Sequence, residues 1–107
     1  MGEGAHDRVT DAGMVDYLLD QLDDPAISAR RMFGGHGIYR DGRMFAIVYD
    51  DAVYLKVSDD EAKTSDRPPF RPRPNQTFPT YREVSADELE DADTLREMAV
   101  RARASAS

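Results

Sequence analysis

Residues 38–57 have the sequence IYRDGRMFAIVYDDAVYLKV, in which two short turns separate three apolar runs. Asp41-Gly42 favours a two-residue hairpin turn, because both positions accept positive φ angles at low cost. Asp50-Asp51 separates the second run from the third in the same way. Strands joined by turns this short must be antiparallel. The pattern therefore predicts three antiparallel strands, over residues 38–40, 43–49 and 52–57.

Further elements are expected on both sides of this stretch. Ser28–Phe33 and Thr77–Val84 have the composition of strands, and a short acidic helix is expected from Ser58 or Asp59 to about Thr64. Residues 67–74, RPPFRPRP, contain four prolines. Prolines at this density remove too many backbone donors for a helix or a central strand. We therefore expect an extended loop there, carrying three arginines.

A long helix is expected near each end of the chain. The first has Asp11 as its N-cap and ends before Pro25, because the residue before a proline resists the helical region. Its apolar face consists of Met14, Val15, Leu18, Leu19 and Leu22. Ser85 and Glu88 form a capping box that opens the second helix. Its inner face consists of Leu89, Ala92, Leu95, Met98, Ala99 and Ala102. We predict a two-layer α+β fold, with both helices on one face of an antiparallel sheet of about five strands.

The length of 107 residues fits one domain. We expect a disordered leader over residues 1–9, a single domain over 10–103 and a frayed tail over 104–107. No apolar run approaches the roughly 20 residues needed to span a bilayer, and the start lacks the core of a signal peptide. We therefore expect a cytoplasmic protein without membrane contact.

The charge balance narrows the class of partner. Twenty-one acidic and fourteen basic residues give a net charge of −7, which argues against a domain that wraps nucleic acid. Only two of the basic residues are lysines, Lys56 and Lys63, and most of the acids are aspartates. This halophile-like composition suits a salt-rich cytoplasm, with ordinary acidic solubility as the alternative.

Candidate chemistry is sparse. Without a cysteine the chain has no disulfide, thiolate metal site or cysteine nucleophile. His6 and His36 are far apart in sequence, and no serine lies in a Gly-x-Ser-x-Gly elbow. Residues 34–37, GGHG, could present N–H groups to an anion beside Arg30 and Arg31, or could simply form a tight strand connection. We expect no metal, no cofactor and no enzymatic activity.

The alternation of side chains along the strands leaves both sheet faces apolar. When Val48 is set opposite Val53, one face carries Tyr39, Met44, Ala46, Val48, Val53, Leu55 and Val57. The smaller side chains of that face suit close packing under helices. The other face carries Ile38, Phe45, Ile47, Tyr49, Tyr54 and Lys56. Only two long helices are available to cover the two faces.

The second face could be covered in three ways. Phe70, Phe78 and Tyr81 could fold over it within the chain, a second copy could cover it in a homodimer, or an unidentified protein partner could bind it. Exposed apolar patches of several hundred Å² usually mark interfaces. The candidate interaction face consists of Ile38, Phe45, Ile47 and Tyr54, with Lys56 as a polar rim.

Arginines suggest a nucleic-acid contact as the alternative function. The candidates for anion or nucleic-acid contacts are Arg30, Arg31, Arg71 and Arg73, and tyrosines such as Tyr39 and Tyr54 are available for stacking. Given the net charge, we expect duplex DNA binding to be weak and unspecific.

The central segment resembles a known family. Residues 31–47, RMFGGHGIYRDGRMFAI, followed by 53–57, VYLKV, are similar to the N-terminal domain of the TfoX/Sxy competence regulators. Pro69-Phe70 and the segment from Tyr81 to Ala102 resemble the second half of that domain, so the likeness covers about residues 10–103. The resemblance implies a two-layer α+β fold similar to secretion chaperones. It also implies a role in activating genes for DNA uptake, together with a cyclic-AMP receptor protein and without catalysis. We therefore expect a stand-alone, non-enzymatic protein-interaction domain that is an accessory in transcriptional regulation.

Overall fold

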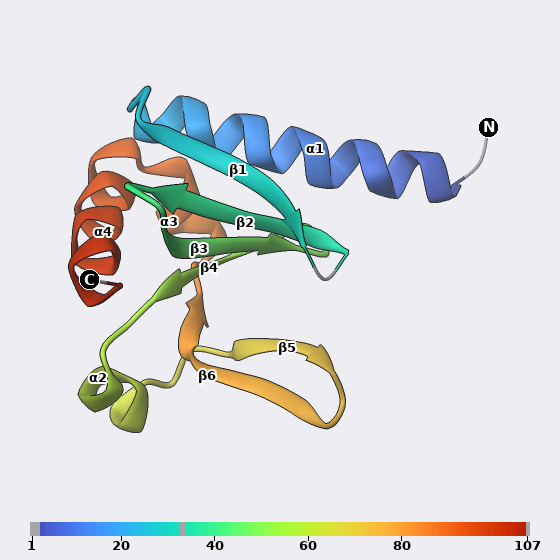
Figure 1. The fold of residues 1–107 in the computed structure, drawn as a ribbon. Coiled ribbons are helices and arrows are strands. Elements are labelled where there is room, and N and C mark those ends of the chain that lie inside the picture. The colour runs from blue at the N-terminus through green and yellow to red at the C-terminus, as the bar shows by residue number, and fades with distance from the viewer. Residues whose placement is uncertain (1–2, 33, 107) are drawn as a thin grey trace.

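The computed structural model describes the backbone of residues 3–32 and 34–106, and the side chains of residues 12–32 and 34–106. Ten elements follow one another (Figure 1). They are α1 (Glu3–Leu22), β1 (Ile27–Met32), β2 (Gly35–Arg40), β3 (Arg43–Tyr49), β4 (Ala52–Lys56), α2 (Asp59–Thr64), β5 (Pro69–Arg73), β6 (Gln76–Glu83), α3 (Ala86–Glu90) and α4 (Ala92–Ser105).

The strands form one antiparallel sheet in the order β1-β2-β3-β4-β6-β5. The predicted α+β class is confirmed, with six strands in place of about five. The additional strand is β5, which lies in the proline-rich segment that the sequence predicted as a loop. Because β5 is an edge strand, its prolines cost the sheet few hydrogen bonds.

The terminal helices α1 and α4 cover one face of the sheet. Val15, Leu18 and Leu22 of α1 and Leu95, Ala99 and Ala102 of α4 pack into one buried cluster with residues of β2, β3 and β4. These positions recur every three or four residues, which is the spacing that aligns side chains along one side of a helix. The predicted apolar faces of both terminal helices are confirmed, except at Ala92, which lies outside this cluster.

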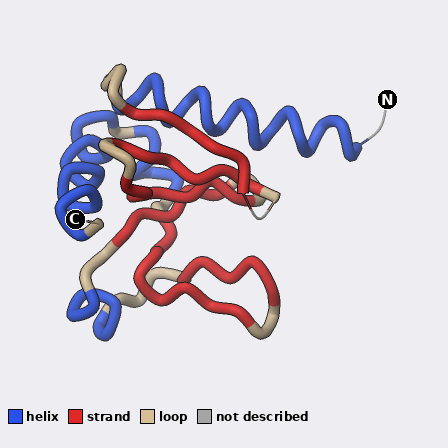
Figure 2. Tube along the Cα trace, in the orientation of Figure 1, coloured by secondary structure: helices blue, strands red, loops and turns tan. Residues whose placement is uncertain are grey.

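The β5–β6 hairpin covers part of the opposite face. In Figure 1 this hairpin lies on the other side of β2 and β3 from α1, and Figure 2 shows the same separation of α1 and the hairpin. Its Phe70 is fully buried and forms a second cluster with Ile47 and Tyr81. Partly buried Met44, Tyr49, Tyr54 and Phe78 pack against that cluster. Around Ile47 and Tyr54 the second sheet face is therefore covered within the chain, one of the three arrangements that the sequence left open.

A β-bulge changes the predicted faces. The β2–β3 register pairs Ile38 with Ala46 but Tyr39 with Met44, so Phe45 is an extra residue on β3. Ile38 and Phe45 consequently lie in the cluster under the helices, while Met44 lies against the second cluster. The predictions for these three residues are wrong, because strict alternation does not hold across a bulge.

The boundaries of the terminal helices also differ from prediction. Helix α1 begins at Glu3, so residues 3–9, expected as a leader, are helical. The single helix expected after Ser85 is divided at Asp91, which is the C-cap of α3 and the N-cap of α4. Helix α4 continues to Ser105, inside the expected tail. In the part of the chain that the structure describes, no helix combines the length and apolarity needed to cross a membrane.

Candidate functional site

The predicted interaction face is not one exposed surface. Ile38 and Phe45 are fully buried under the helices, and Ile47 is buried in the second cluster. Tyr54 is half-buried, with its ring centroid 5.2 Å from that of Phe70. Of the five residues predicted to form this face, only Tyr54 and Lys56 keep part of their side chains in solvent. Ile47 could contact a partner only if the hairpin moved, and Ile38 and Phe45 only if the helices moved.

The edge of this face is held by polar contacts inside the chain. Lys56 Nζ donates to Thr80 Oγ1 at 3.1 Å and lies 5.4 Å from the ring centroid of Tyr81. The hydroxyl of Tyr81 donates to the carbonyl oxygen of Met44 at 3.0 Å. Burial raises the pKa of Tyr81 and that of Tyr54. These contacts attach β6 to β3 and β4, so the hairpin is fixed over the face.

The four candidate arginines fall into two pairs. Arg30 and Arg31 lie on β1, whereas Arg71 and Arg73 lie on β5. These are the two edge strands of the sheet, at opposite ends of the strand order. All four side chains are exposed, and the Arg30 guanidinium carbon lies 5.1 Å from the Tyr39 ring centroid. The arrangement gives two separate basic edges instead of one patch.

The glycine-rich segment is a packed strand connection. Gly34 has a φ of +81°, which a residue with a side chain rarely adopts, and Gly35 begins β2. A Cβ on Gly35 would meet the carbonyl oxygen of Val48, and one on Gly37 would lie 2.6 Å from Met32 Sδ. Close packing over β2 therefore accounts for the glycines at 35 and 37, and the open backbone cradle that an anion requires is not formed in β2.

An apolar groove lies between α1 and α3. Met14 and Tyr17 of α1 face Ala86, Leu89 and Glu90 of α3, and the groove has a volume of about 370 Å³. Tyr17 is 39% exposed and is one of two large hydrophobic residues exposed in the described part of the chain. We call these five residues the α1–α3 groove.

Hydrogen bonds between the helices hold the two walls of the groove together. The hydroxyl of Tyr17 donates to the carbonyl oxygen of Leu89 at 2.7 Å. Gln21 Nε2 donates to the same carbonyl and to the Tyr17 hydroxyl, each at 3.2 Å. Because α3 ends at Glu90, the carbonyl of Leu89 has no donor from its own helix and needs one from elsewhere. The break at Asp91 thus supplies the acceptor that joins α3 to α1.

The surroundings of the groove are strongly acidic. Residues 12–23 contain three acids and residues 85–94 contain five, and neither segment has a lysine or arginine. Glu88 is paired with Arg67, and Asp91 caps α4 by accepting from Thr94 N. Hydrogen bonding to the Thr94 N–H lowers the pKa of Asp91. Asp16, Asp20, Asp87 and Glu90 are exposed. The groove is therefore apolar in its lining and negative around it.

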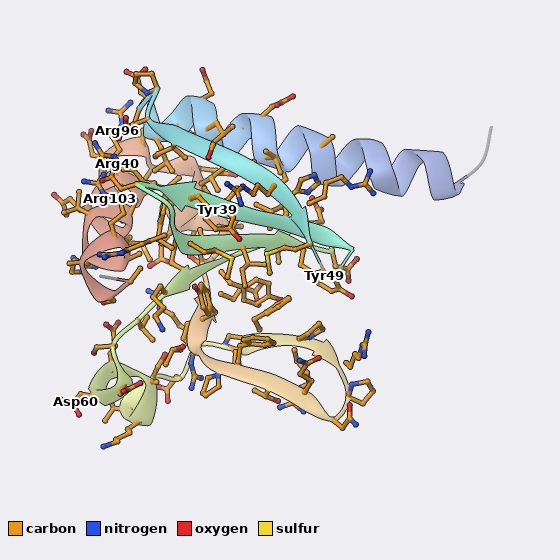
Figure 3. All side chains as sticks on the ribbon, viewed as in Figure 1. Tyr39, Arg40, Tyr49, Asp60, Arg96 and Arg103 are labelled. Carbon is orange, nitrogen blue, oxygen red and sulfur yellow. The ribbon has the colours of Figure 1, made fainter. Side chains whose placement is uncertain are left out.

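A second cavity, of about 320 Å³, lies between the β2–β3 turn and the end of α4. Its lining includes Arg40, Arg43 and Arg103, and Figure 3 shows Arg40 and Arg103 at the same end of the molecule. Arg40 Nε lies 2.8 Å from Asp24 Oδ2, and Arg103 Nη1 lies 3.8 Å from the same oxygen. Hydrogen bonds from the Ala26 N–H and from Arg40 lower the pKa of Asp24. Two of the three guanidinium groups are thus already paired with a carboxylate.

The described residues show no metal site: no three His, Asp or Glu side chains converge there in a way that could hold an ion. His36 Nδ1 is buried and has no hydrogen-bond partner in the described part of the chain.

The predictions made from the sequence do not include the groove. Met14 was assigned to the core face of the first helix, and Tyr17 was not singled out. The available signal was that Met14 and Tyr17 widen the apolar stripe of α1 beyond the buried positions 15, 18 and 22. That excess would have indicated a second contact on the flank of α1.

Comparison with known proteins identifies the family. The sequence model of the TfoX N-terminal domain matches residues 18–106, nearly the whole chain. A search of curated proteins found no match. The TfoX N-terminal domain is not a known enzyme family, and it places the chain in a competence-related regulatory context. The match includes both predicted sheet faces, the capping box and all four candidate arginines, so this chain belongs to the TfoX N-terminal domain family.

Proposed function

We propose that this chain is a non-enzymatic protein-interaction domain of a regulatory system, and that the α1–α3 groove is where its partner docks. A role as an accessory in transcriptional regulation fits the competence-related setting of the family. The groove takes the place of the sheet face that the sequence favoured as the docking site, because the β5–β6 hairpin packs over Ile47 on that face.

One observation carries the proposal. Tyr17 has a large aromatic side chain, is 39% exposed, and lies in an apolar groove between two helices. Binding energy at protein interfaces concentrates in aromatic anchors that become buried in such concave sites. The hydroxyl of Tyr17 is already bonded to Leu89, so a partner that covers the ring leaves no hydrogen-bonding group unpaired.

A nucleic-acid contact is the second candidate, and the exposed arginines favour it. Arg31, Arg71 and Arg73 are exposed, and they form no ion pair with the residues that the structure describes. Arginines without carboxylate partners are free to contact phosphates. Their division between two edge strands and the net charge of −7 count against a continuous binding path.

Affinity capture from a native lysate, with and without nuclease, separates the two functions. The immobilised proteins are the wild type, Tyr17→Ala, and the double variant Arg71→Ala/Arg73→Ala. We expect a defined protein to be captured in the presence of nuclease, to be lost with Tyr17→Ala and to be retained by the double variant. Capture that nuclease abolishes, and that depends on the two arginines but not on Tyr17, would contradict the proposal. Circular dichroism of each variant checks that it is folded.

A further inference from the structure

We infer that the α1–α3 groove accepts a basic amphipathic helix, whose apolar side chains enter the groove and whose lysines and arginines face the acids around it. This inference rests on the proposed function, because it names the chemical class of the partner that docks at the same site.

The lining selects an apolar contact. Met14, Tyr17, Ala86 and Leu89 supply thioether, aromatic and aliphatic surface to a space of about 370 Å³. Methionine is unbranched and flexible, so it adapts to side chains of different shapes. Residues spaced three and four apart on a helix present the narrow apolar ridge that such a groove takes.

The hydrogen bonds at the groove leave little for a polar ligand to satisfy. Tyr17, Gln21 and the Leu89 carbonyl bond to one another. A polar group brought to this position would lose its water without gaining a partner there, which costs free energy. An apolar side chain carries no such cost, so the site discriminates in favour of apolar anchors.

The backbone around the groove favours a helix over a strand. A peptide that binds as an added strand needs a row of free N–H and C=O groups along a sheet edge. The edge strands of this sheet are β1 and β5, whereas the groove is formed by α1 and α3. Helices satisfy their own backbone groups, so an incoming segment must do the same, and a helix does this.

The charge around the groove determines which charge a partner must carry. Eight acids occur in residues 12–23 and 85–94. Arg67 pairs with Glu88 and Arg96 with Asp93, and the other six acids form no ion pair with the residues that the structure describes. Glu90 itself lines the groove. Such a field attracts basic segments and repels acidic peptides, nucleic acids and anionic membranes. The Debye length is about 8 Å at physiological salt and becomes shorter as salt is added. The attraction between the groove and a basic segment must therefore weaken as the salt concentration rises.

Two matched charge reversals test whether the acids around the groove attract the basic partner. Glu90→Lys reverses a charge at the groove, and Asp60→Lys reverses an exposed charge on α2. Figure 3 shows Asp60 at the end of the molecule opposite to α1. Both substitutions raise the net charge of the chain by two, and Asp60→Lys additionally breaks only an exposed ion pair with Lys63 inside α2.

The probes are three synthetic peptides measured by fluorescence anisotropy. The first has leucines at helical spacing and lysines elsewhere, the second is a scrambled peptide of the same composition, and the third has glutamates in place of the lysines. We expect only the first to bind, with a Kd on the order of micromolar. Tyr17→Ala should weaken its binding by about tenfold or more. Glu90→Lys should weaken it roughly three- to tenfold, and Asp60→Lys should leave it nearly unchanged.

Equal binding of the scrambled peptide, or equal weakening by Glu90→Lys and Asp60→Lys, would overturn the inference by showing unspecific charge attraction. Binding of the acidic peptide would also overturn it. If no basic peptide binds, but capture of a lysate protein still requires Tyr17, then the partner class is wrong and the proposed docking function stands. If capture does not require Tyr17, the docking function itself fails.

Discussion

The hydroxyl of Tyr17 donates to the carbonyl oxygen of Leu89 at 2.7 Å, across a sequence separation of 72 residues. This bond joins the first helix of the chain to the short helix α3. It satisfies a carbonyl that the end of α3 leaves without an intrahelical donor. The same two residues line the α1–α3 groove, so one contact both stabilises the fold and forms the proposed docking site.

Tyr17→Phe separates these two roles, because it removes the hydroxyl and keeps the ring. We expect a loss of about 0.5–1.5 kcal/mol in the free energy of unfolding, measured with urea. Gln21 still donates to Leu89, which favours the lower end of that range. Binding of the basic peptide should persist. The control is Tyr39→Phe, since among the described residues the Tyr39 hydroxyl has only a 4.0 Å contact with Met32 Sδ. Equal losses in the two variants would contradict this reading of Tyr17.

Glu88 makes the free energy of unfolding depend on pH at acidic values. Its carboxylate pairs with both terminal nitrogens of Arg67, at 2.6 and 2.7 Å, and accepts from the Ser85 N–H at 2.9 Å. The Arg67 hydrogen bonds, followed by those of Ser85, lower the pKa of Glu88 to about 2. A lowered pKa means that the charged group stabilises the fold above pH 4.5 and that this stabilisation is lost as pH falls toward 2.

We expect Glu88→Gln to reduce the free energy of unfolding at pH 7 by about 1–3 kcal/mol. The difference from the wild type should shrink as pH falls from 4.5 to 2. Urea unfolding across this range measures it. Asp87→Asn, at an exposed neighbouring acid in α3, is the control. A difference that stays constant down to pH 2 would show that the ionised carboxylate is not its source.

Gly35 is predicted to tolerate no side chain. A Cβ there would meet the carbonyl oxygen of Val48, which belongs to the backbone of β3 and cannot rotate away. Gly35→Ala should cost about 1–3 kcal/mol, as overpacking does. Gly37→Ala should cost less, because its nearest neighbours are the Sδ atoms of Met32 and Met44, which are flexible.

Gly13→Ala is the opposite control for this pair. Gly13 lies inside α1, and outside its own stretch of helix no described atom lies within 4 Å of the added Cβ, so alanine should stabilise by about 0.5–1 kcal/mol. Thermal or urea melts of the three variants give the order. A Gly35→Ala protein as stable as the wild type would mean that β2 and β3 are not so closely packed.

Phe70 is predicted to be the residue that fixes the β5–β6 hairpin over the sheet. Its ring centroid lies between 5.2 and 5.4 Å from those of Tyr49, Tyr54 and Phe78. Phe70→Ala should cost about 3–5 kcal/mol, as large-to-small core substitutions do. Val100→Ala, at a valine that is 54% exposed, should change stability by only about 0.5 kcal/mol. Similar melting points for the two variants would show that the hairpin does not cover this face.

Local patterns predicted most of the elements. The predicted strand over residues 43–49 matches β3. The short acidic helix matches α2 with Ser58 as its N-cap, and the capping box of Ser85 and Glu88 is formed. These features depend on residues close together in sequence, where turn chemistry, capping and periodicity act directly.

The features that were missed depend on packing between distant segments. The bulge at Phe45 is not visible in the alternation of apolar residues, and it exchanges Ile38, Phe45 and Met44 between the faces. The proline-rich segment becomes a strand because its position at the edge of the sheet tolerates proline. The groove exists only because α1 and α3 meet, and no local pattern specifies that meeting.

Methyl NMR of methionine-labelled protein tests most directly whether the α1–α3 groove is the docking surface. Met14 lines the groove. Met44 packs against the second cluster, and the Sδ atoms of Met32 and Met44 both lie over Gly37. Single methionine-to-leucine substitutions assign the signals. On titration with the basic amphipathic peptide, the account predicts that the Met14 methyl signal shifts and that those of Met32 and Met44 do not. Shifts at Met32 and Met44, with Met14 unchanged, would contradict it.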